Sequence, residues 1–259
     1  MKIATWNVNS LKVRLPQVLQ WLVDNPVDVL CLQETKTVDE KFPRAEIEAA
    51  GYQVIFSGQK TYNGVAILST HPMTDVVRNN AHFADEQQRV IATTIQDVRV
   101  ICVYVPNGQS PESDKYQYKL RWLDGLQQWL TVEVATHPKL ALLGDYNIAP
   151  EDRDVHDPSA WIGQVLVSEP ERAAYQKMLS LQLKDAFRLF EQGDKLFSWW
   201  DYRQMAFRRN RGMRIDHILL SPELAGACTA CVIDRAPRKW EQPSDHTPVI
   251  ATIDLPNEI

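Results

Sequence analysis

The chain has little of what marks disulfide-rich, fibrous or multi-domain proteins. Its 259 residues include only four cysteines, and its ten glycines and fifteen prolines are spread along the chain instead of gathering into a flexible linker. Cys31 and Cys102 lie within apolar, strand-like runs, where we expect them to be small core side chains. With 44% hydrophobic and 24% charged residues, residues 1–259 are expected to form a single globular domain.

Export and membrane signals are also missing. Trp6, Asn7 and Asn9 interrupt the stretch where a signal peptide has its apolar run, and no later stretch approaches the roughly 18 apolar residues of a membrane span. We therefore expect a cytoplasmic, monomeric protein with no membrane partner and no obligate protein partner. Cys228 and Cys231 are spaced as in a metal knuckle, but without a second pair or a flanking His they are interpreted as structural.

The net charge of −5 argues at first against a polyanionic partner such as nucleic acid. The distribution of charge reverses this argument, because residues 202–215 contain arginines and no acid. Aromatic side chains lie among them, and cationic with aromatic side chains together suit phosphates and unstacked bases or sugars. The alternative is a solvated, arginine-rich loop. The arginines are Arg203, Arg208, Arg209, Arg211 and Arg214, and the neighbouring large side chains are Trp199, Trp200, Tyr202, Phe207 and Met213.

Hydrophobic periodicity predicts the same strand, helix, strand unit twice. In the first unit, a strand over 2–8 precedes a helix with Leu15, Val18, Leu19, Leu22 and Val23 on one face and Pro16 in its first turn. A strand over 28–33 completes this unit. The second unit has a strand over 98–105, a helix whose apolar residues run from Tyr116 to Val134, and a strand over 140–143.

The remaining segments predict antiparallel strands and one further helix. Residues 54–56, 64–69 and 90–95 look like antiparallel strands, and an irregular segment over 148–168 precedes a helix with Tyr175, Met178, Leu179 and Leu183. Apolar runs over 215–220 and 249–253 predict two further strands. Amphipathic helices and strands each have an apolar face that must be buried against another element, so two packed sheets flanked by helices are expected.

Polar side chains that can bind ligands stand where these strands end. A lone Asp or Asn there is usually a turn residue, but a shared position at many strand ends is how scaffolds present a catalytic site. Several converging carboxylates would repel one another without a cation, and their hard oxygen atoms select magnesium or manganese. The residues are Asn7, Asn9, Glu34, Tyr104, Asn107, Asp145, Asn147, Asp216, His217, Asp245 and His246.

Competing chemistries lack their residues. The sequence has no Cys and His pair at zinc spacing, no Gly-rich loop of Walker type and no serine in a nucleophile-elbow pattern. Metal-assisted hydrolysis of a phosphate ester is the interpretation that remains.

Seven ordered motifs make the chain resemble, nearly end to end, the bacterial exonuclease III branch of the apurinic/apyrimidinic endonuclease family, within the endonuclease/exonuclease/phosphatase superfamily. The residues Ser198-Trp199-Trp200-Asp201-Tyr202-Arg203 and Asn210-Arg211-Gly212 are also similar to this branch. The seven motifs are Thr5-Trp6-Asn7-Val8-Asn9, Leu32-Gln33-Glu34-Thr35-Lys36, Tyr62-Asn63-Gly64-Val65-Ala66, Tyr104-Val105-Pro106-Asn107-Gly108, Gly144-Asp145-Tyr146-Asn147-Ile148, Arg214-Ile215-Asp216-His217 and Ser244-Asp245-His246.

The resemblance implies an α/β (α+β) fold, a four-layer αββα sandwich of two mixed sheets with two similar halves. It also implies a Mg²⁺-dependent DNA repair phosphodiesterase for double-stranded DNA with abasic sites or blocked 3′ ends, with Mn²⁺ as a substitute ion. The expected metal residues are Asn7, Glu34 and Asp245, with Asp145, Asn147 and His246 as second-position ligands.

The resemblance further implies which residues do the chemistry. Asp145, oriented by Asn147, would deprotonate the attacking water, and His246, paired with Asp216, would face the phosphate, with Tyr104 beside it. Asn107 would contact the same phosphate. Trp199, Met213 and Ile215 would form an apolar pocket for a flipped-out, baseless sugar, and Arg211 is a further substrate-binding candidate.

The sequence departs from abasic endonucleases at Leu166 and Val167, where those enzymes commonly have a small residue followed by Phe. A larger side chain at the first position narrows the sugar pocket, so removal of 3′-phosphates or 3′→5′ exonuclease action is expected to outweigh abasic cleavage. One alternative is a non-catalytic nucleic-acid-binding regulator on the same fold, which would have lost part of the acid cluster. Another is a phosphatase for lipids or small molecules, which would lack the basic and aromatic segment.

Overall fold

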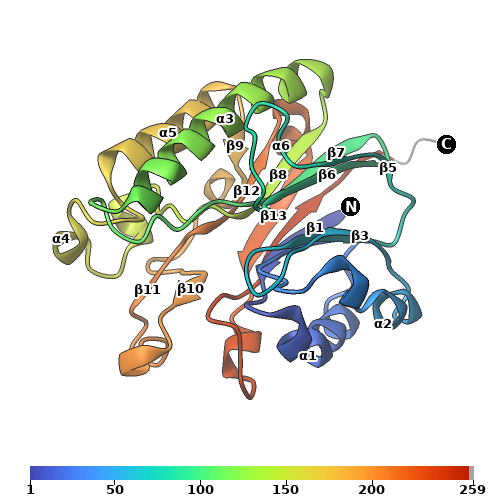
Figure 1. Ribbon diagram of the computed structural model, residues 1–259, viewed down its shortest axis with the longest axis horizontal. Coiled ribbons are helices and arrows are strands. Elements are labelled where there is room, and N and C mark those ends of the chain that lie inside the picture. The colour runs from blue at the N-terminus through green and yellow to red at the C-terminus, as the bar shows by residue number, and fades with distance from the viewer. Residues whose placement is uncertain (257–259) are drawn as a thin grey trace.

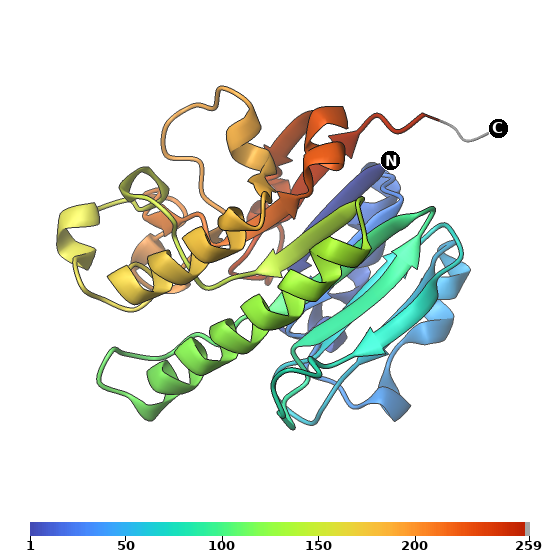
Figure 2. The ribbon, with the colours of Figure 1, turned by 90° about the horizontal axis from the view of Figure 1, so that it is seen from above.

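The computed structural model describes residues 1–256, and these form two six-stranded sheets packed face to face (Figure 1). Helices cover the outer face of each sheet, so the layers run helix, sheet, sheet, helix. Figure 2, seen from above, shows the long helix α3 (Asp114–Thr136) lying along the strands of its sheet. This arrangement confirms the expected αββα sandwich.

The first sheet has the strand order β13-β14-β1-β2-β4-β3 and carries α1 (Leu11–Asp24) and α2 (Arg44–Ala49) on its outer face. Its fully buried side chains on that face include Trp6, Leu30 and Leu68, which pack with Trp21 of α1 and Ile47 of α2. The strands are β1 (Lys2–Asn7), β2 (Val29–Gln33), β3 (Gln53–Ser57), β4 (Val65–Ser69), β13 (Cys228–Ile233) and β14 (Val249–Ile253).

The second sheet has the order β5-β6-β7-β8-β12-β9 and lies under α3 and α5 (Glu169–Ser180). Its strands are β5 (Thr74–Arg78), β6 (Val90–Ile95), β7 (Val98–Tyr104), β8 (Leu140–Asp145), β9 (Lys184–Asp185) and β12 (Asp216–Leu220). The smaller elements are α4 (Pro158–Trp161), α6 (Pro222–Ala227), the hairpin of β10 (Trp199–Trp200) with β11 (Gly212–Met213), and 3₁₀ turns at Asp39–Lys41, Asp152–Asp154, Ala186–Leu189, Arg203–Met205 and Ala236–Lys239.

The two halves repeat one unit, as the periodicity predicted. β1 pairs with β2 in parallel across α1, and β7 pairs with β8 in parallel across α3. Parallel neighbours bring their carboxyl ends to the same edge of a sheet. Glu34 therefore follows β2 beside the end of β1, and Asp145 ends β8 beside Tyr104.

The shared core lies between the two sheets. It contains fully buried aliphatic side chains from both sheets, such as Ile67 of β4 and Val100 of β7, together with the free thiols of Cys31 and Cys102. Burying each such aliphatic side chain stabilises the fold by about 1.5–3 kcal/mol. Because both sheets contribute to one apolar layer, the strand ends of the two halves are held at a fixed separation.

Several local predictions were wrong in detail. α1 begins at Leu11, whose side chain is fully buried, so Pro16 lies inside the helix and not in its first turn. Val23 is 74% exposed, and Trp21 takes the expected place in the core. Leu183 lies beyond the end of α5, and strands β5 and β13 were not predicted. In the described part of the chain, no helix is both long and apolar enough to cross a membrane.

Candidate active site

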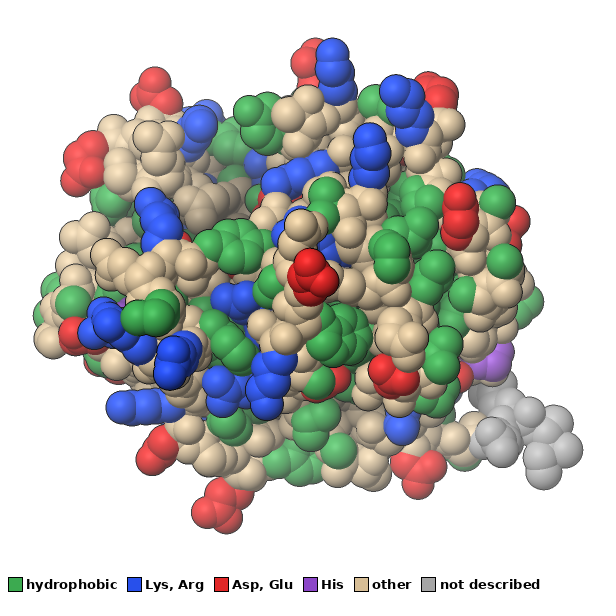
Figure 3. Space-filling model, turned by 90° about the horizontal axis from the view of Figure 1, so that it is seen from below, with side chains coloured by type: hydrophobic (Ala, Val, Ile, Leu, Met, Phe, Trp, Pro, Cys, Tyr) green, Lys and Arg blue, Asp and Glu red, His purple; other side chains and the backbone are tan. Residues whose placement is uncertain are grey.

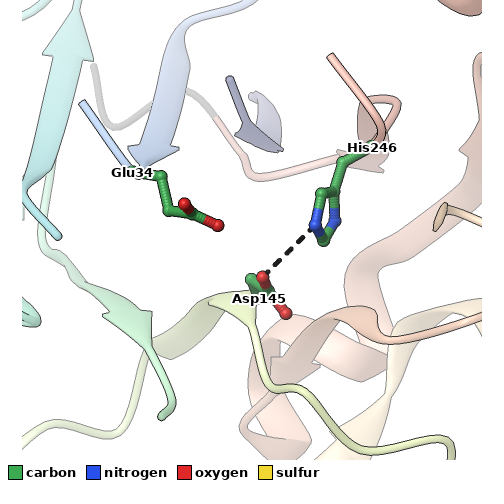
Figure 4. Close-up of side chains that lie close together, drawn as sticks. All are labelled: Glu34, Asp145 and His246. Atoms are coloured by element: carbon green, nitrogen blue, oxygen red, sulfur yellow. Dashed lines mark ion pairs between the residues drawn. The ribbon is translucent and has the colours of Figure 1, made fainter. Parts of the chain in front are cut away.

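Three side chains from distant parts of the sequence meet where the two sheets end. Glu34 follows β2, Asp145 ends β8, and His246 lies in the loop before β14. Figure 4 shows the three side chains pointing toward one another. One ligand atom from each lies within 4.8 Å of the other two. The structure thus brings together residues that the motifs predicted, from both halves of the fold.

Asn7 links the two carboxylates of this cluster. Its side-chain amide donates hydrogen bonds to Glu34 Oε1 at 2.7 Å and to Asp145 Oδ2 at 2.8 Å. The side-chain oxygen of Asn7, Oδ1, accepts a hydrogen bond from the backbone N–H of Asn9 at 3.0 Å. In this arrangement the fully buried Asn7 orients the carboxylates through its nitrogen, and its expected role as a metal ligand through oxygen stays a prediction.

His246 lies between two carboxylates. Its Nδ1 is 2.8 Å from Asp216 Oδ2, and its Nε2 is 3.5 Å from Asp145 Oδ2. Burial by itself would lower the pKa of His246, but Asp216 and Asp145 overcome that effect and raise this pKa from 6.5 to about 10. The ring is therefore an imidazolium at neutral pH. In this form His246 supplies positive charge to the cluster, and its expected role as a second-position metal ligand stays a prediction.

Burial acts on Asp145 in the opposite direction. Desolvation raises the pKa of Asp145 to about 7, the charge of His246 opposes this shift, and the nearby Asp216 adds to it. The backbone N–H of Asn147 donates to Asp145 Oδ1 at 2.9 Å. Asn147 thus orients Asp145 through its backbone, while its side chain donates to the carbonyl oxygen of Val105 at 2.9 Å. A buried carboxylate with a pKa near neutrality is suited to accept a proton.

Asp245 lies at the edge of the cluster. Its carboxylate accepts hydrogen bonds from the Asn9 side chain at 3.2 Å and from the Trp199 indole at 3.1 Å. Lys36 approaches from the other side, with Nζ 2.7 Å from Asn9 Oδ1 and 3.3 Å from Glu34 Oε2. Asn9 therefore connects Asp245 with the environment of Glu34, and a metal-binding role for Asp245 stays a prediction.

The donor atoms fit a hard divalent cation. Two carboxylates, those of Glu34 and Asp145, converge on one amide group of Asn7, and Glu34 retains a partly exposed side chain at 19%. Carboxylate oxygens that converge in this way are the ligands preferred by Mg²⁺ and Mn²⁺. The described residues place no cysteine in this group.

A cavity of about 670 Å³ opens beside the cluster and is lined by Asn63, Tyr104, Asn107 and Arg89. Burial raises the pKa of Tyr104 well above its usual value, and the charges of Glu34 and Asp145 add to this shift, so the phenol keeps its proton. Asn107 donates to Asn147 Oδ1 at 3.3 Å. Tyr104 and Asn107 can therefore both present hydrogen-bond donors to an anion in this cavity.

The residues of the predicted sugar pocket belong to a buried apolar cluster in this structure. Met213 and Ile215 are buried with Leu166, which is only 4% exposed, and Trp199 packs against the same cluster. Leu166 has a backbone φ of 78°, an uncommon conformation for a leucine. Trp199 and Met213 face each other across the β10–β11 hairpin. The Leu166 side chain thus packs in the same buried cluster as the residues expected to hold a sugar.

Comparison with known proteins agrees with this geometry. The chain matches the model of the Endonuclease/Exonuclease/phosphatase family over residues 4–246. The chain belongs to this family. It is 36% identical to the exodeoxyribonuclease III of Haemophilus influenzae over 97% of this chain and 99% of that protein. It is also similar to two solved structures, the 3′ phosphatase NExo from Neisseria bound to a product DNA hairpin (46% identity, TM-score 0.97, 98% and 100% of the two chains) and an AP endonuclease from Archaeoglobus fulgidus (42%, 0.95, 98% and 100%).

The arginine-rich segment of this family member is not uniformly exposed, which corrects one expectation. Arg214 is 1% exposed and forms buried ion pairs with Asp154 at 2.7 Å and with Asp185 at 2.8 Å. Arg203 is exposed but pairs with Asp201 at 2.8 Å. The expectation treated all the arginines of the segment as one surface, whereas an arginine at the start of a buried strand must be paired.

Arg208, Arg209 and Arg211 stay on the surface of the loop between β10 and β11. Within residues 1–256, no hydrogen bond or ion pair joins the side chain of Arg211 to the acid cluster. Its expected substrate contact stays a prediction.

His217 follows Asp216 on β12 and faces the opposite side of the strand. Its Nε2 is 2.8 Å from the Ile148 carbonyl oxygen and its Nδ1 is 3.1 Å from Arg214 Nη1. Burial, reinforced by the charge of Arg214, lowers the pKa of His217 to about 4. His217 is therefore a neutral, hydrogen-bonded core residue.

Sequence reasoning missed a buried ion pair behind the cluster, that of Lys119 on α3 with Glu171 on α5. Both side chains are fully buried. Two signals were available. Lys119 stands three residues after Tyr116 and four before Leu123, on the apolar face of the helix, and Glu171 is the third residue of α5 after Ser168, the spacing of a capping box.

Proposed function

We propose that this chain is a Mg²⁺-dependent DNA repair phosphodiesterase that acts on double-stranded DNA with abasic sites or blocked 3′ ends. Its activities would be 3′→5′ exonuclease, 3′-phosphatase and abasic-site endonuclease. The convergence of Glu34, Asp145 and His246 carries this proposal, in a chain that is similar to exodeoxyribonuclease III over its full length. A single domain over residues 1–259 and a cytoplasmic location are part of the proposal.

Each residue would have one task in hydrolysis. Asp145 would accept a proton from the attacking water, because its raised pKa of about 7 makes it a stronger base than an exposed carboxylate. The imidazolium of His246, held by Asp216 at 2.8 Å, would face the phosphate and offset its developing negative charge. Tyr104 and Asn107 would donate hydrogen bonds to phosphate oxygens.

Glu34 would hold the metal ion together with Asp145, and Asn7 would orient both carboxylates. When bound, Mg²⁺ offsets charge on the phosphate and on the leaving oxygen. Mn²⁺ prefers the same oxygen ligands and is expected to substitute.

The surface beside the cluster supports a nucleic-acid substrate. Figure 3, seen from below, shows Lys and Arg side chains gathered with hydrophobic side chains on the left of this face, the side to which the β10–β11 loop projects in Figure 1. The loop carries the exposed Arg208, Arg209 and Arg211, together with Met205, which is 54% exposed. Cationic side chains near apolar ones suit a phosphate backbone with accessible sugars and bases.

We further propose that 3′-phosphate removal outweighs abasic cleavage in this chain. Leu166 is buried in one cluster with Met213 and Ile215, so we expect a flipped-out sugar to have to displace this leucine side chain. A 3′-terminal phosphate needs no such pocket. Of the two similar structures, one is a 3′ phosphatase and the other an AP endonuclease, so both activities occur among proteins of this fold.

Three labelled duplexes test both proposals: one with an internal abasic site, one with a 3′-phosphate end and one undamaged, each with Mg²⁺. Asp145→Asn is the control variant, because it keeps the size of the side chain and removes the base. Cleavage by the wild type and not by the variant is the expected result. Protein that binds DNA but cleaves none of the duplexes would instead support a non-catalytic regulator. A strong preference for the abasic duplex would refute the proposed order of activities.

A further inference from the structure

The ammonium group of Lys119 connects three segments behind the active site. Nζ donates to the backbone carbonyl oxygens of Asn107 at 3.1 Å and of Asn147 at 2.6 Å, and it also forms the ion pair with Glu171. A lysine has three N–H donors, so each of them has an acceptor on a different segment. Two of these acceptors belong to residues beside the catalytic cluster.

Glu171 extends the same connection to the Leu166 segment. Its Oε1 accepts from Lys119 and from the backbone N–H of Leu166 at 3.0 Å. Its Oε2 accepts from the backbone N–H and the hydroxyl of Ser168, at 3.2 and 2.6 Å. The four acceptor positions of the carboxylate are thus filled. A side chain with this many buried partners has little freedom to move alone.

The backbone around these groups is hydrogen-bonded and closely packed. Leu166 adopts its left-handed φ of 78° with both backbone polar groups bonded, its N–H to Glu171 and its carbonyl oxygen to the N–H of Ala149 at 2.9 Å. Gly108 packs against Lys119, since a Cβ atom there would lie 3.2 Å from Lys119 Cδ. The uncommon conformation of Leu166 persists because its surroundings determine it.

We propose that the Lys119–Glu171 pair is a positioning pair that fixes the Asn107 loop, the Asp145–Asn147 turn and the Leu166 segment relative to one another. Through Asn147 it would align the base Asp145, and through Leu166 it would keep the sugar pocket filled. The pair therefore sets both the rate of hydrolysis and the choice between 3′-phosphate and abasic substrates. The kinetic part of this inference rests on the proposed function, but the structural part does not.

The test compares two double variants, each of which replaces a buried ion pair with one member on α3. Lys119→Met/Glu171→Met removes both charges at once, so no buried charge is left unpaired. Arg99→Met/Glu133→Met is the matched control, because Arg99 and Glu133 form a second buried ion pair at 2.7 Å near the other end of α3. Hydrogen exchange in peptides covering 105–110, 145–150 and 164–169 is measured without metal or DNA. The kcat and KM on the 3′-phosphate and abasic duplexes are measured with Mg²⁺.

For the Lys119/Glu171 variant we expect exchange in all three peptides to rise at least tenfold. We also expect kcat on the 3′-phosphate duplex to fall at least tenfold, KM to change less than threefold, and the abasic to 3′-phosphate ratio to rise. The Arg99/Glu133 variant should leave these quantities within twofold. Unchanged exchange, equal effects of the two variants, or raised exchange with unchanged kcat and ratio would each overturn the inference. If the wild type cleaves no duplex, the proposed function fails while exchange still decides whether the pair tethers the three segments.

Discussion

Leu166 allows one prediction in which stability and specificity are tested by the same substitutions, Leu166→Ala and Leu166→Gly. The side chain is 4% exposed and packs with Met213 and Ile215, so truncation creates a cavity at the expected sugar pocket. Truncating a buried leucine to alanine costs about 2–5 kcal/mol. We expect Leu166→Ala to lower the free energy of unfolding by an amount within this range.

A glycine at position 166 should affect stability differently from a glycine at most other positions. At ordinary strand or helix positions glycine is less stable than alanine by roughly 0.5–1 kcal/mol. At a φ of 78°, however, an L-residue with a side chain is strained, by about 1–2 kcal/mol. Leu166→Gly relieves this strain, so we expect it to be at least as stable as Leu166→Ala. Both variants open the pocket, and accommodating the sugar should raise abasic cleavage roughly tenfold or more relative to 3′-phosphate removal.

Urea unfolding of the two variants measures the first expectation, and cleavage of the abasic and 3′-phosphate duplexes measures the second. A glycine variant less stable than the alanine variant by about 1 kcal/mol would refute the argument from backbone strain. An unchanged ratio of the two cleavage rates in both variants would refute the argument that Leu166 blocks the pocket.

Three further predictions concern charge. His217→Gln should make the free energy of unfolding less sensitive to acid, because in the wild type the unfolded chain protonates this histidine below pH 6.5 while the buried side chain stays neutral to about pH 4. Between pH 7 and pH 4 the free energy of unfolding of the wild type should fall by on the order of 3 kcal/mol more than that of the variant. Asp216→Asn should lower the pKa of His246, which is about 10 in the wild type. In the wild type, the stability that charged His246 contributes is lost as the pH rises from 6.5 through about 10, so unfolding measured in chelator should show a smaller loss over this range for the variant. Replacing Arg208 and Arg209 with Gln should reduce the salt dependence of duplex binding by up to about 0.9 in slope per lost phosphate contact, with a slope equal to the wild type as the contrary outcome.

Much of the fold could be predicted from the sequence because its signals are local. Apolar residues recur at helical spacing from Tyr116 to Val134, and α3 forms there. The apolar run that ends at Asp145 forms a fully buried strand, whose carboxyl end places the carboxylate at the edge of the sheet. The positions of Glu34 and Asp145 at strand ends were therefore predictable, since each depends on the unit that contains it.

Other features depend on contacts between segments far apart in the chain, and only the tertiary structure decided them. Asp216 lies beside Asp145 because β12 pairs with β8 in antiparallel register, and this pairing places the partner of His246 next to the base. The same packing buries Arg214 between two acids, although the arginines that precede it in the segment, Arg208, Arg209 and Arg211, are exposed. The charge on a side chain is visible in the sequence. Whether that side chain contacts solvent, a substrate or a buried partner depends on which distant segments pack against it. For Lys119 the buried partner is the carboxylate of Glu171, 52 residues away.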